Sequence, residues 1–267
     1  LRPAVVAAYR AAGTTRVLET ASPSNVAVAQ RNYAIWGYDP VILHRYARFI
    51  AFTQMDRIRP IHDPTLLQPT RFHPLLSMLR TRLHVVWKTQ ETIDHPDPLP
   101  RFVLLRDYRV ITDEDAILTA MGAPDFDPRR SLILESEPTP PPLGGDALPV
   151  KGRVRVIDQS TDHVDLEVDL ADAAILVVTD SYSNGWRAIA LAGSEQADYR
   201  LLPANYVLRA VALSAGHHRL RLEYSPWPWR AGLWATGVSG LLYLAALAWW
   251  GFDSWRSRPS PATAAST

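Results

Sequence analysis

Residues 231–252 form an uncharged stretch, and this stretch restricts the fold more than any other part of the sequence. At a rise of roughly 1.5 Å per residue, a helix of this length spans about the 30 Å hydrocarbon core of a bilayer. Core helices of soluble proteins seldom run this long without a polar face, which disfavours the alternative of a buried helix. Tryptophan is enriched at membrane interfaces, and three lie at each end: Trp227, Trp229 and Trp234, then Trp249, Trp250 and Trp255. We therefore expect a transmembrane helix at residues 231–252.

Small residues recur four positions apart on one side of this helix: Gly232, Thr236 and Gly240. Small residues allow helices to approach closely in lipid, so we expect contact with other transmembrane helices of the same protein. The alternative is a single anchor that meets lipid on all sides. Arg256 and Arg258 follow the helix and indicate a cytoplasmic C-terminus, a signal that Arg230 at the other end weakens.

Composition excludes several classes of function. The chain has 28 basic and 27 acidic residues, which gives no reason to expect a nucleic-acid partner. It has no cysteine, which excludes disulfides, thiol catalysis and cysteine metal sites. No phosphate loop or hydrolase motif occurs, so we predict no catalytic residue, metal site or cofactor. The first residues do not resemble a signal peptide, so the chain is expected to be a fragment or a tail-anchored cytoplasmic protein.

Residues 1–136 mix helix and strand patterns. Predicted helices cover residues 3–12, 41–50, 75–82 and 112–121, and predicted strands cover residues 16–19, 83–87, 101–105 and 131–134. Thr112 is expected to cap the last of these helices, because acidic residues follow it in the first turn. Residues 137–150 are rich in proline and glycine and are predicted to be a linker between two domains.

The hydrophobic period changes to two after the linker. Residues 163–170 alternate apolar and acidic side chains, which indicates a strand with one wet face. Residues 174–178 are continuously apolar and are predicted to form a central strand. Further strands are expected at residues 186–191, 206–213 and 218–224. The fold class is therefore α+β: a mixed α/β subdomain at residues 1–136, an antiparallel β-sandwich at residues 151–226, one C-terminal transmembrane helix, and a polar tail at residues 253–267.

A series of short motifs in the second half occurs in a characteristic order: residues 179–182 (TDSY), 185–186 (GW), Asn205, and residues 209–211 (RAV), 215–217 (AGH) and 224–226 (YSP). Earlier segments add to it: residues 37–40 (GYDP), 99–101 (LPR) and 126–128 (FDP). This order resembles the C-terminal region of YfhO-type bacterial membrane proteins. Ser183 and Asn184 depart from the family pattern, which more often has a bulky residue and a proline there.

The resemblance implies a function. YfhO-like proteins are polytopic and similar to GT-C glycosyltransferases, which take sugars from a polyprenyl-phosphate lipid and modify cell-envelope polymers. The catalytic acidic residue of such a protein would lie in an N-terminal helix bundle that this sequence does not contain. The chain would be the C-terminal extracytoplasmic module, held at the cell membrane. Its partners would be the bilayer, a polyprenyl-phosphate sugar and an envelope glycopolymer.

The candidate substrate-binding residues come from these motifs: Asp180, Tyr182, Trp186, Asn205, Arg209 and Asp39. A carboxylate beside an aromatic ring suits a sugar-binding surface, which makes Asp180 and Trp186 the leading pair. The alternative is that Trp186 is core and Asp180 bonds the turn at residues 183–185. Asp39 could equally cap the helix that follows it.

Two further interpretations remain open at this stage. Four arginines could contact a lipid phosphate or an anionic polymer, or be ordinary surface charges: Arg45, Arg48, Arg101 and Arg209. The protein could also be a non-catalytic, membrane-anchored module that binds carbohydrate or assists envelope assembly.

Overall fold

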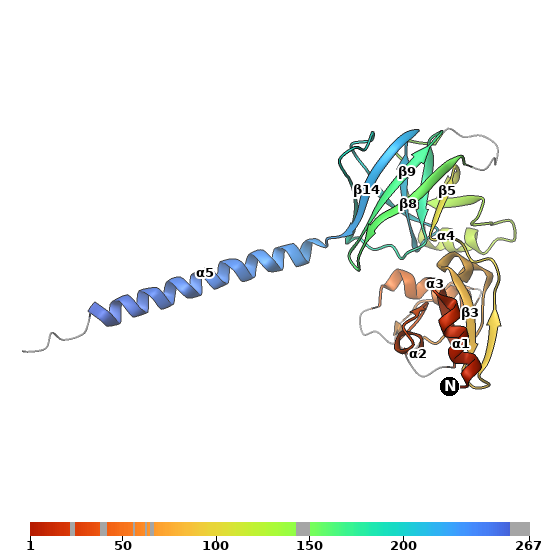
Figure 1. Cartoon of the computed structure of the whole chain (residues 1–267), viewed down its shortest axis with the longest axis horizontal. Helices are drawn as coiled ribbons and strands as arrows, with labels where there is room; N and C mark the ends of the chain where they lie inside the picture. The colour runs from red at the N-terminus through yellow and green to blue at the C-terminus, as the bar shows by residue number, and fades with distance from the viewer. Residues whose placement is uncertain are drawn as a thin grey trace, which may run out of the picture. The chain divides into compact units, whose positions relative to one another are not determined.

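The computed structural model describes residues 1–21, 25–37, 42–55, 57–61, 63–64, 67–142 and 150–256. The chain divides into two compact units, Leu1–Tyr224 and Ser225–Thr267. The first unit contains both helices and several sheets, and the second contains one long helix (Figure 1). The α+β fold class is therefore confirmed.

A four-stranded sheet opens the first unit, in the order β2-β1-β3-β4. Its strands are β1 (Arg16–Thr20), β2 (Tyr33–Ala34), β3 (Thr81–Val86) and β4 (Glu91–Asp94). Strand β1 runs parallel to both β2 and β3, so these three strands all start at the same end of the sheet. Helix α1 (Pro3–Ala12) begins with a proline, as predicted, and packs its buried residues against β1 and β3. The short helix α2 (Val26–Ala29) precedes β2.

A six-stranded sheet follows, in the order β5-β10-β13-β12-β7-β6. Its strands are β5 (Phe102–Leu105), β6 (Asp107–Val110), β7 (Ser131–Leu134), β10 (Ala174–Val178), β12 (Leu201–Ala204) and β13 (Leu208–Leu213). Three of these strands precede the predicted linker and three follow it. The structure therefore differs from the predicted domain division: strands from both sides of residues 137–150 join one sheet, and the boundary between compact units lies after Tyr224.

This six-stranded sheet is one layer of a sandwich. The other layer is a four-stranded sheet with the order β11-β14-β9-β8. Its strands are β8 (Gly152–Gln159), β9 (His163–Leu170), β11 (Trp186–Ala190) and β14 (Gly216–Tyr224). The predicted β-sandwich is confirmed, since apolar residues of β9 and β14 pack against β10 and β13. Strand β10 is apolar throughout because both of its faces are covered: Leu176 and Val178 face the second sheet, while Ile175 and Val177 face a core beneath the helices.

Helices cover the other face of the six-stranded sheet: α3 (His44–Met55), the 3-10 helix η2 (Pro74–Leu79) and α4 (Glu114–Met121). Two expectations need correction here. Asp113, not Thr112, caps α4, because its carboxylate accepts a hydrogen bond from the Ala116 amide at 2.8 Å. The helix predicted at residues 75–82 is the shorter η2, which ends where Arg80 adopts a left-handed conformation.

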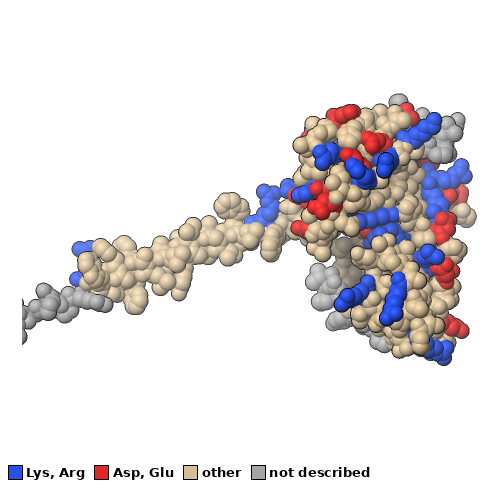
Figure 2. All heavy atoms as spheres, viewed as in Figure 1, with Lys and Arg blue, Asp and Glu red and all other residues tan. Residues whose placement is uncertain are grey.

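Helix α5 (Trp227–Arg256) makes up most of the described part of the second unit. Its 30 residues extend about 45 Å. Among the described residues it is the one helix that is long and apolar enough to cross a membrane. Arg230 and Arg256 are the basic residues within α5, and Figure 2 shows the surface between its two ends free of Lys and Arg colouring. The long apolar helix is thus as predicted, with one further turn at each end, whereas its partner helices remain a prediction.

Candidate functional site

Asp180 lies two residues after β10 and forms ion pairs with three arginines. Its carboxylate accepts hydrogen bonds at 3.0 Å from Arg16, Arg80 and Arg101. The Asp180 side chain is only 14% exposed. Asp180 therefore connects the first sheet to the sandwich. Arg16 and Arg80 lie where β1 and β3 of the first sheet begin, and Arg101 directly precedes β5 of the sandwich.

Local structure explains why these arginines converge. Arg16 begins β1 and Arg80 directly precedes β3, and the starts of these parallel strands are neighbours. The Arg16 amide donates a hydrogen bond to the Arg80 carbonyl oxygen at 2.9 Å. Arg101 is held by Thr179, whose amide donates to the Arg101 carbonyl oxygen at 3.0 Å. Backbone pairing thus brings the three side chains to the end of β10.

Arg209 contributes a fourth positive charge to the same region. It pairs with Val178 across the β10–β13 ladder, and only 6% of it is exposed. Its Nε donates to the Ser181 carbonyl oxygen at 2.8 Å, and its guanidinium carbon lies 3.6 Å from the centre of the Trp186 ring. This is a close cation–π contact. We call Asp180, Arg16, Arg80, Arg101 and Arg209 the Asp180 cluster.

The electrostatics of the Asp180 cluster are unbalanced. Burial alone would raise the pKa of Asp180, but the surrounding arginines lower it below its ordinary value. Burial lowers the pKa of Arg209 to about 10, although Asp180 acts in the opposite direction. Burial and the charge of Arg16 likewise lower the pKa of Arg80. Within the described residues, no carboxylate other than Asp180 forms an ion pair with these arginines, so four positive charges surround one negative charge.

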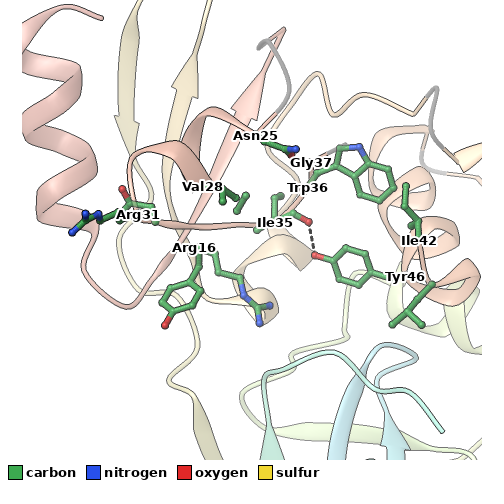
Figure 3. A pocket seen from close by; sticks show the side chains of 13 residues that line it. Arg16, Asn25, Val28, Arg31, Ile35, Trp36, Gly37, Ile42 and Tyr46 are labelled. Carbon is green, nitrogen blue, oxygen red and sulfur yellow. Dashed lines mark hydrogen bonds between the residues drawn. The ribbon is translucent and has the colours of Figure 1, made fainter. Parts of the chain in front are cut away.

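A pocket of about 860 Å³ lies beside the cluster, and Arg16 belongs to both (Figure 3). Trp36 and Tyr46 line this pocket with nearly parallel rings, whose centres are 6.2 Å apart. The Tyr46 hydroxyl donates to the Ile35 carbonyl oxygen at 2.6 Å, which fixes the ring. Figure 3 shows the Arg16 side chain directed toward Tyr46, whereas Arg31 points away from Trp36.

The pocket wall depends on a glycine. A Cβ atom on Gly37 would lie 2.2 Å from the Asn25 Oδ1 atom, so any larger residue would displace the Asn25 side chain. Tyr46 is half-buried, and burial raises its pKa to about 12 while the positive charge of Arg16 acts in the opposite direction. The pocket therefore combines aromatic surfaces with two asparagines and two arginines, a set of groups that suits a polar ligand with flat apolar faces.

The leading pair of predicted residues agrees with the alternative interpretation for Trp186 but not for Asp180. Asp180 bonds arginines, whereas the alternative interpretation had it bonding the turn at residues 183–185. Trp186 is half-buried and packs against the sandwich core. Arg209 covers its ring, and the Tyr224 ring centre lies 5.5 Å away. Trp186 therefore does not offer the open stacking surface that we expected.

The other predicted residues are spread over the unit. Asn205 is 1% exposed, and its Oδ1 accepts a hydrogen bond from the Ile133 amide at 2.8 Å, so it holds β7 rather than facing a ligand. Tyr182 is half-buried, and its amide donates to the Val207 carbonyl oxygen at 2.8 Å. Asp39 lies outside the described residues.

Arg45 and Arg48 form a separate cluster that is balanced by acidic residues. Arg48 pairs with Glu114 and Asp115, and Arg45 pairs with Glu135. Because carboxylates match these arginines, they are not available for a lipid phosphate. Arg101 and Arg209 belong instead to the Asp180 cluster.

Sequence reasoning missed Arg16, Arg80, Trp36 and Tyr46 as site residues. Residues 32–40 are visibly aromatic, which was a usable signal for Trp36. Nothing in the sequence marks Arg16 or Arg80, because their roles depend on the parallel pairing of β1 with β3.

In comparisons with known proteins, no family model, curated protein or solved structure matches the chain. The arrangement of the Asp180 cluster and the pocket is therefore the basis for a functional proposal.

Proposed function

We propose that this chain is the C-terminal, extracytoplasmic module of a polytopic glycosyltransferase-like membrane protein. The whole protein would use a polyprenyl-phosphate-linked sugar to modify cell-envelope polymers. This module would hold a saccharide in the pocket that Arg16, Trp36 and Tyr46 line, and the catalytic group would lie elsewhere in the protein.

One observation carries the proposal: an aromatic pocket of sugar-sized volume lies in a unit whose chain continues directly into α5. Ligand sites typically have volumes of about 300–1,000 Å³, and 860 Å³ falls within this range. Aromatic rings bind the flat faces of sugars, and Asn25 adds an amide at the pocket wall. The motif order described above supports the family, and α5 is suited to hold the module at a membrane.

Saccharide binding is tested with the full chain in phosphatidylcholine nanodiscs. We expect glucose and glucose 1-phosphate to shift the Trp36 indole signal in an NMR spectrum, where the signal is assigned by Trp36→Phe. In calorimetric titrations, which do not depend on the indole signal, Trp36→Ala should weaken glucose binding by about tenfold, the equivalent of one stacking contact. Trp87→Ala is the matched control, because Trp87 follows β3 and does not line the pocket. Equal losses in the two variants would contradict the assignment of the pocket.

Sidedness has a simple test because the chain contains no cysteine. A single cysteine is introduced at Thr161, in an exposed turn, or at Ser266, in the C-terminal tail. In intact cells, a membrane-impermeant maleimide should label Thr161→Cys and leave Ser266→Cys unlabelled. Labelling in the reverse pattern would place the module in the cytoplasm and refute the proposal.

A non-catalytic module that binds an envelope polymer is the second candidate. It is favoured by the enclosure of Asp180, whose carboxylate accepts hydrogen bonds from three arginines. Polymer binding by the intact protein without any sugar transfer would select this alternative. Sugar transfer by the present chain alone would refute our view that it contains no catalytic group.

A further inference from the structure

We propose that His218, Tyr199 and Ser194 form an acid-sensitive latch in the sandwich. At neutral pH the latch holds the loop at residues 191–200 against the turn between β13 and β14, and protonation of His218 releases it. The loop runs from β11 in one layer of the sandwich to β12 in the other, so its release uncouples the two layers at this point. The latch is independent of the proposed function, because none of its three residues is among those that line the pocket beside the Asp180 cluster.

His218 lies inside the sandwich with both ring nitrogens in hydrogen bonds. It is 0% exposed and sits on the buried face of β14. Its Nε2 atom is 2.9 Å from the Ser214 carbonyl oxygen, and its Nδ1 atom is 2.8 Å from the Tyr199 hydroxyl oxygen. The Tyr199 hydroxyl is also 2.5 Å from the Ser194 hydroxyl. The Ser194 oxygen accepts a further hydrogen bond from the Arg219 amide at 3.2 Å.

The partners at the two ends of this chain fix the direction of every hydrogen bond. A carbonyl oxygen only accepts hydrogen bonds, so the Nε2 atom of His218 carries a proton that it donates to Ser214. In the neutral ring Nδ1 is then an acceptor, and the Tyr199 hydroxyl donates to it. The Tyr199 oxygen in turn accepts from the Ser194 hydroxyl. The chain therefore runs from the Arg219 amide to His218 with every group satisfied.

Protonation of His218 reverses this order. Nδ1 becomes a donor, so Tyr199 has to accept from His218 and turn its own proton toward Ser194. The Ser194 hydroxyl then loses its acceptor within the chain. In addition, a positive charge forms at a position that water does not reach, which costs free energy. Both effects favour a conformation in which the loop has moved away from the turn.

The charged groups around His218 do not compensate for a buried positive charge. Glu195 and Asp169 favour the charged ring and His217 opposes it, but burial is the largest effect and lowers the pKa of His218 below its ordinary value. Asp169 is moreover paired with His217 at 2.6 Å. Among the described residues, no carboxylate is hydrogen-bonded to the His218 ring. The charged residues next to His218 on β9, on β14 and in the loop are Glu167, Asp169, His217, Arg219, Glu195 and Asp198, whereas β10 and β13 contribute apolar residues to the core that contains Tyr199.

The sign of the shift gives the pH window of the latch. Because the folded-state pKa of His218 is lowered, the latch is fully stable above the unfolded pKa of about 6.5 and loses stability as the pH falls toward the folded value. Burial raises the pKa of Tyr199, so this phenol keeps its proton throughout the window. Lowering the pH from 7.5 to 5.0 should increase opening by up to about thirtyfold, the value for a ring that titrates with a pKa of about 6.5 when open and stays neutral when closed.

Hydrogen exchange of the full chain in phosphatidylcholine nanodiscs measures this opening at pH 7.5 and 5.0, after correction for the intrinsic exchange rate at each pH. The informative amides join the loop to β14: Leu191 donates to the Arg219 carbonyl oxygen at 2.8 Å, and Glu195 to the His217 carbonyl oxygen at 2.9 Å. We expect both amides to lose protection at pH 5.0 by up to about thirtyfold. The other histidines with lowered pKa values, His84 and His95, lie at the β3–β4 hairpin and should not affect this loop.

Two variants test the assignment to His218. The side chain in His218→Gln donates to Ser214 and accepts from Tyr199 without titrating, so protection of the loop should change little between the two pH values. His217→Gln is the matched control, because His217 is the adjacent histidine, is half-buried and pairs with Asp169. This variant should keep the full response. An equal response in His218→Gln and the unmodified protein would overturn the latch, and a response that disappears in His217→Gln would assign it to the His217–Asp169 pair.

The tautomer of His218 provides a second test that needs no variant of this residue. Nitrogen NMR of the imidazole rings in the unmodified protein should show His218 with a proton on Nε2 and none on Nδ1 at pH 7.5. A proton on Nδ1 at that pH would contradict the direction of the hydrogen-bond chain and overturn the proposal, even if His218→Gln failed to fold.

Discussion

Replacement of Asp180 by asparagine removes the one negative charge of the Asp180 cluster with almost no change in shape. The side chain is 14% exposed, and three arginines donate to it at 3.0 Å. Removing one partner of a buried ion pair destabilises a protein by about 3–5 kcal/mol, because the remaining charge stays buried without compensation. For a unit of this size, each kcal/mol corresponds to roughly 2–4 °C, so Asp180→Asn should lower the melting temperature by roughly 6–20 °C.

The assay is thermal unfolding of the full chain in detergent micelles, followed by near-ultraviolet circular dichroism. Asp94→Asn is the matched control, because Asp94 also pairs with an arginine through two hydrogen bonds. Asp94 and Arg82 are 59% and 50% exposed, and an exposed pair contributes only about 0–1 kcal/mol. Similar melting temperatures for the two variants would refute the view that Asp180 joins the first sheet to the sandwich.

The remaining predictions concern pH, the core and the membrane helix. Because the arginines lower the folded-state pKa of Asp180, its stabilising effect is present above the unfolded pKa of about 3.9 and is lost as the pH falls through the folded value. The difference in melting temperature between the unmodified protein and Asp180→Asn should therefore shrink below about pH 4; a constant difference would contradict this. Asn205→Ala leaves the buried Ile133 amide without its acceptor and should cost about 1–3 kcal/mol in urea unfolding, whereas exposed Asn184→Ala should have little effect. Leu242→Arg, near the middle of α5, should reduce membrane insertion by about 2.5–3.5 kcal/mol in a translocation assay, and unchanged insertion would argue against a spanning helix.

Several elements were predictable because their cause is local. The alternating pattern of residues 163–170 gave β9 with its observed bounds, since a strand with one buried face requires a period of two. The apolar run at residues 174–178 gave β10, which is covered on both faces. Strand β4 was missed because all of its residues are exposed, so no hydrophobic period marks it.

The domain division could not be predicted from the chain order. A stretch rich in proline and glycine indicates little regular structure, but it does not tell whether the strands on either side join one sheet. Here β5 pairs with β10, and β7 pairs with β12, across the predicted linker. Strand pairing between distant segments decided the domain division. The hydrophobic pattern of one strand does not identify the strand with which it pairs.

The sequence by itself determined that the chain carries a long apolar helix and a strand-rich region with two-residue periodicity, because both follow from side chains that are close in the chain. Only the tertiary structure decided where the site lies. Asp180 is separated from Arg101, Arg80 and Arg16 by 79, 100 and 164 residues, and it meets them through the pairing of β1 with β3 and of β5 with β10. The electrostatic energy of these charges depends on their distances and burial in space, which no local pattern encodes.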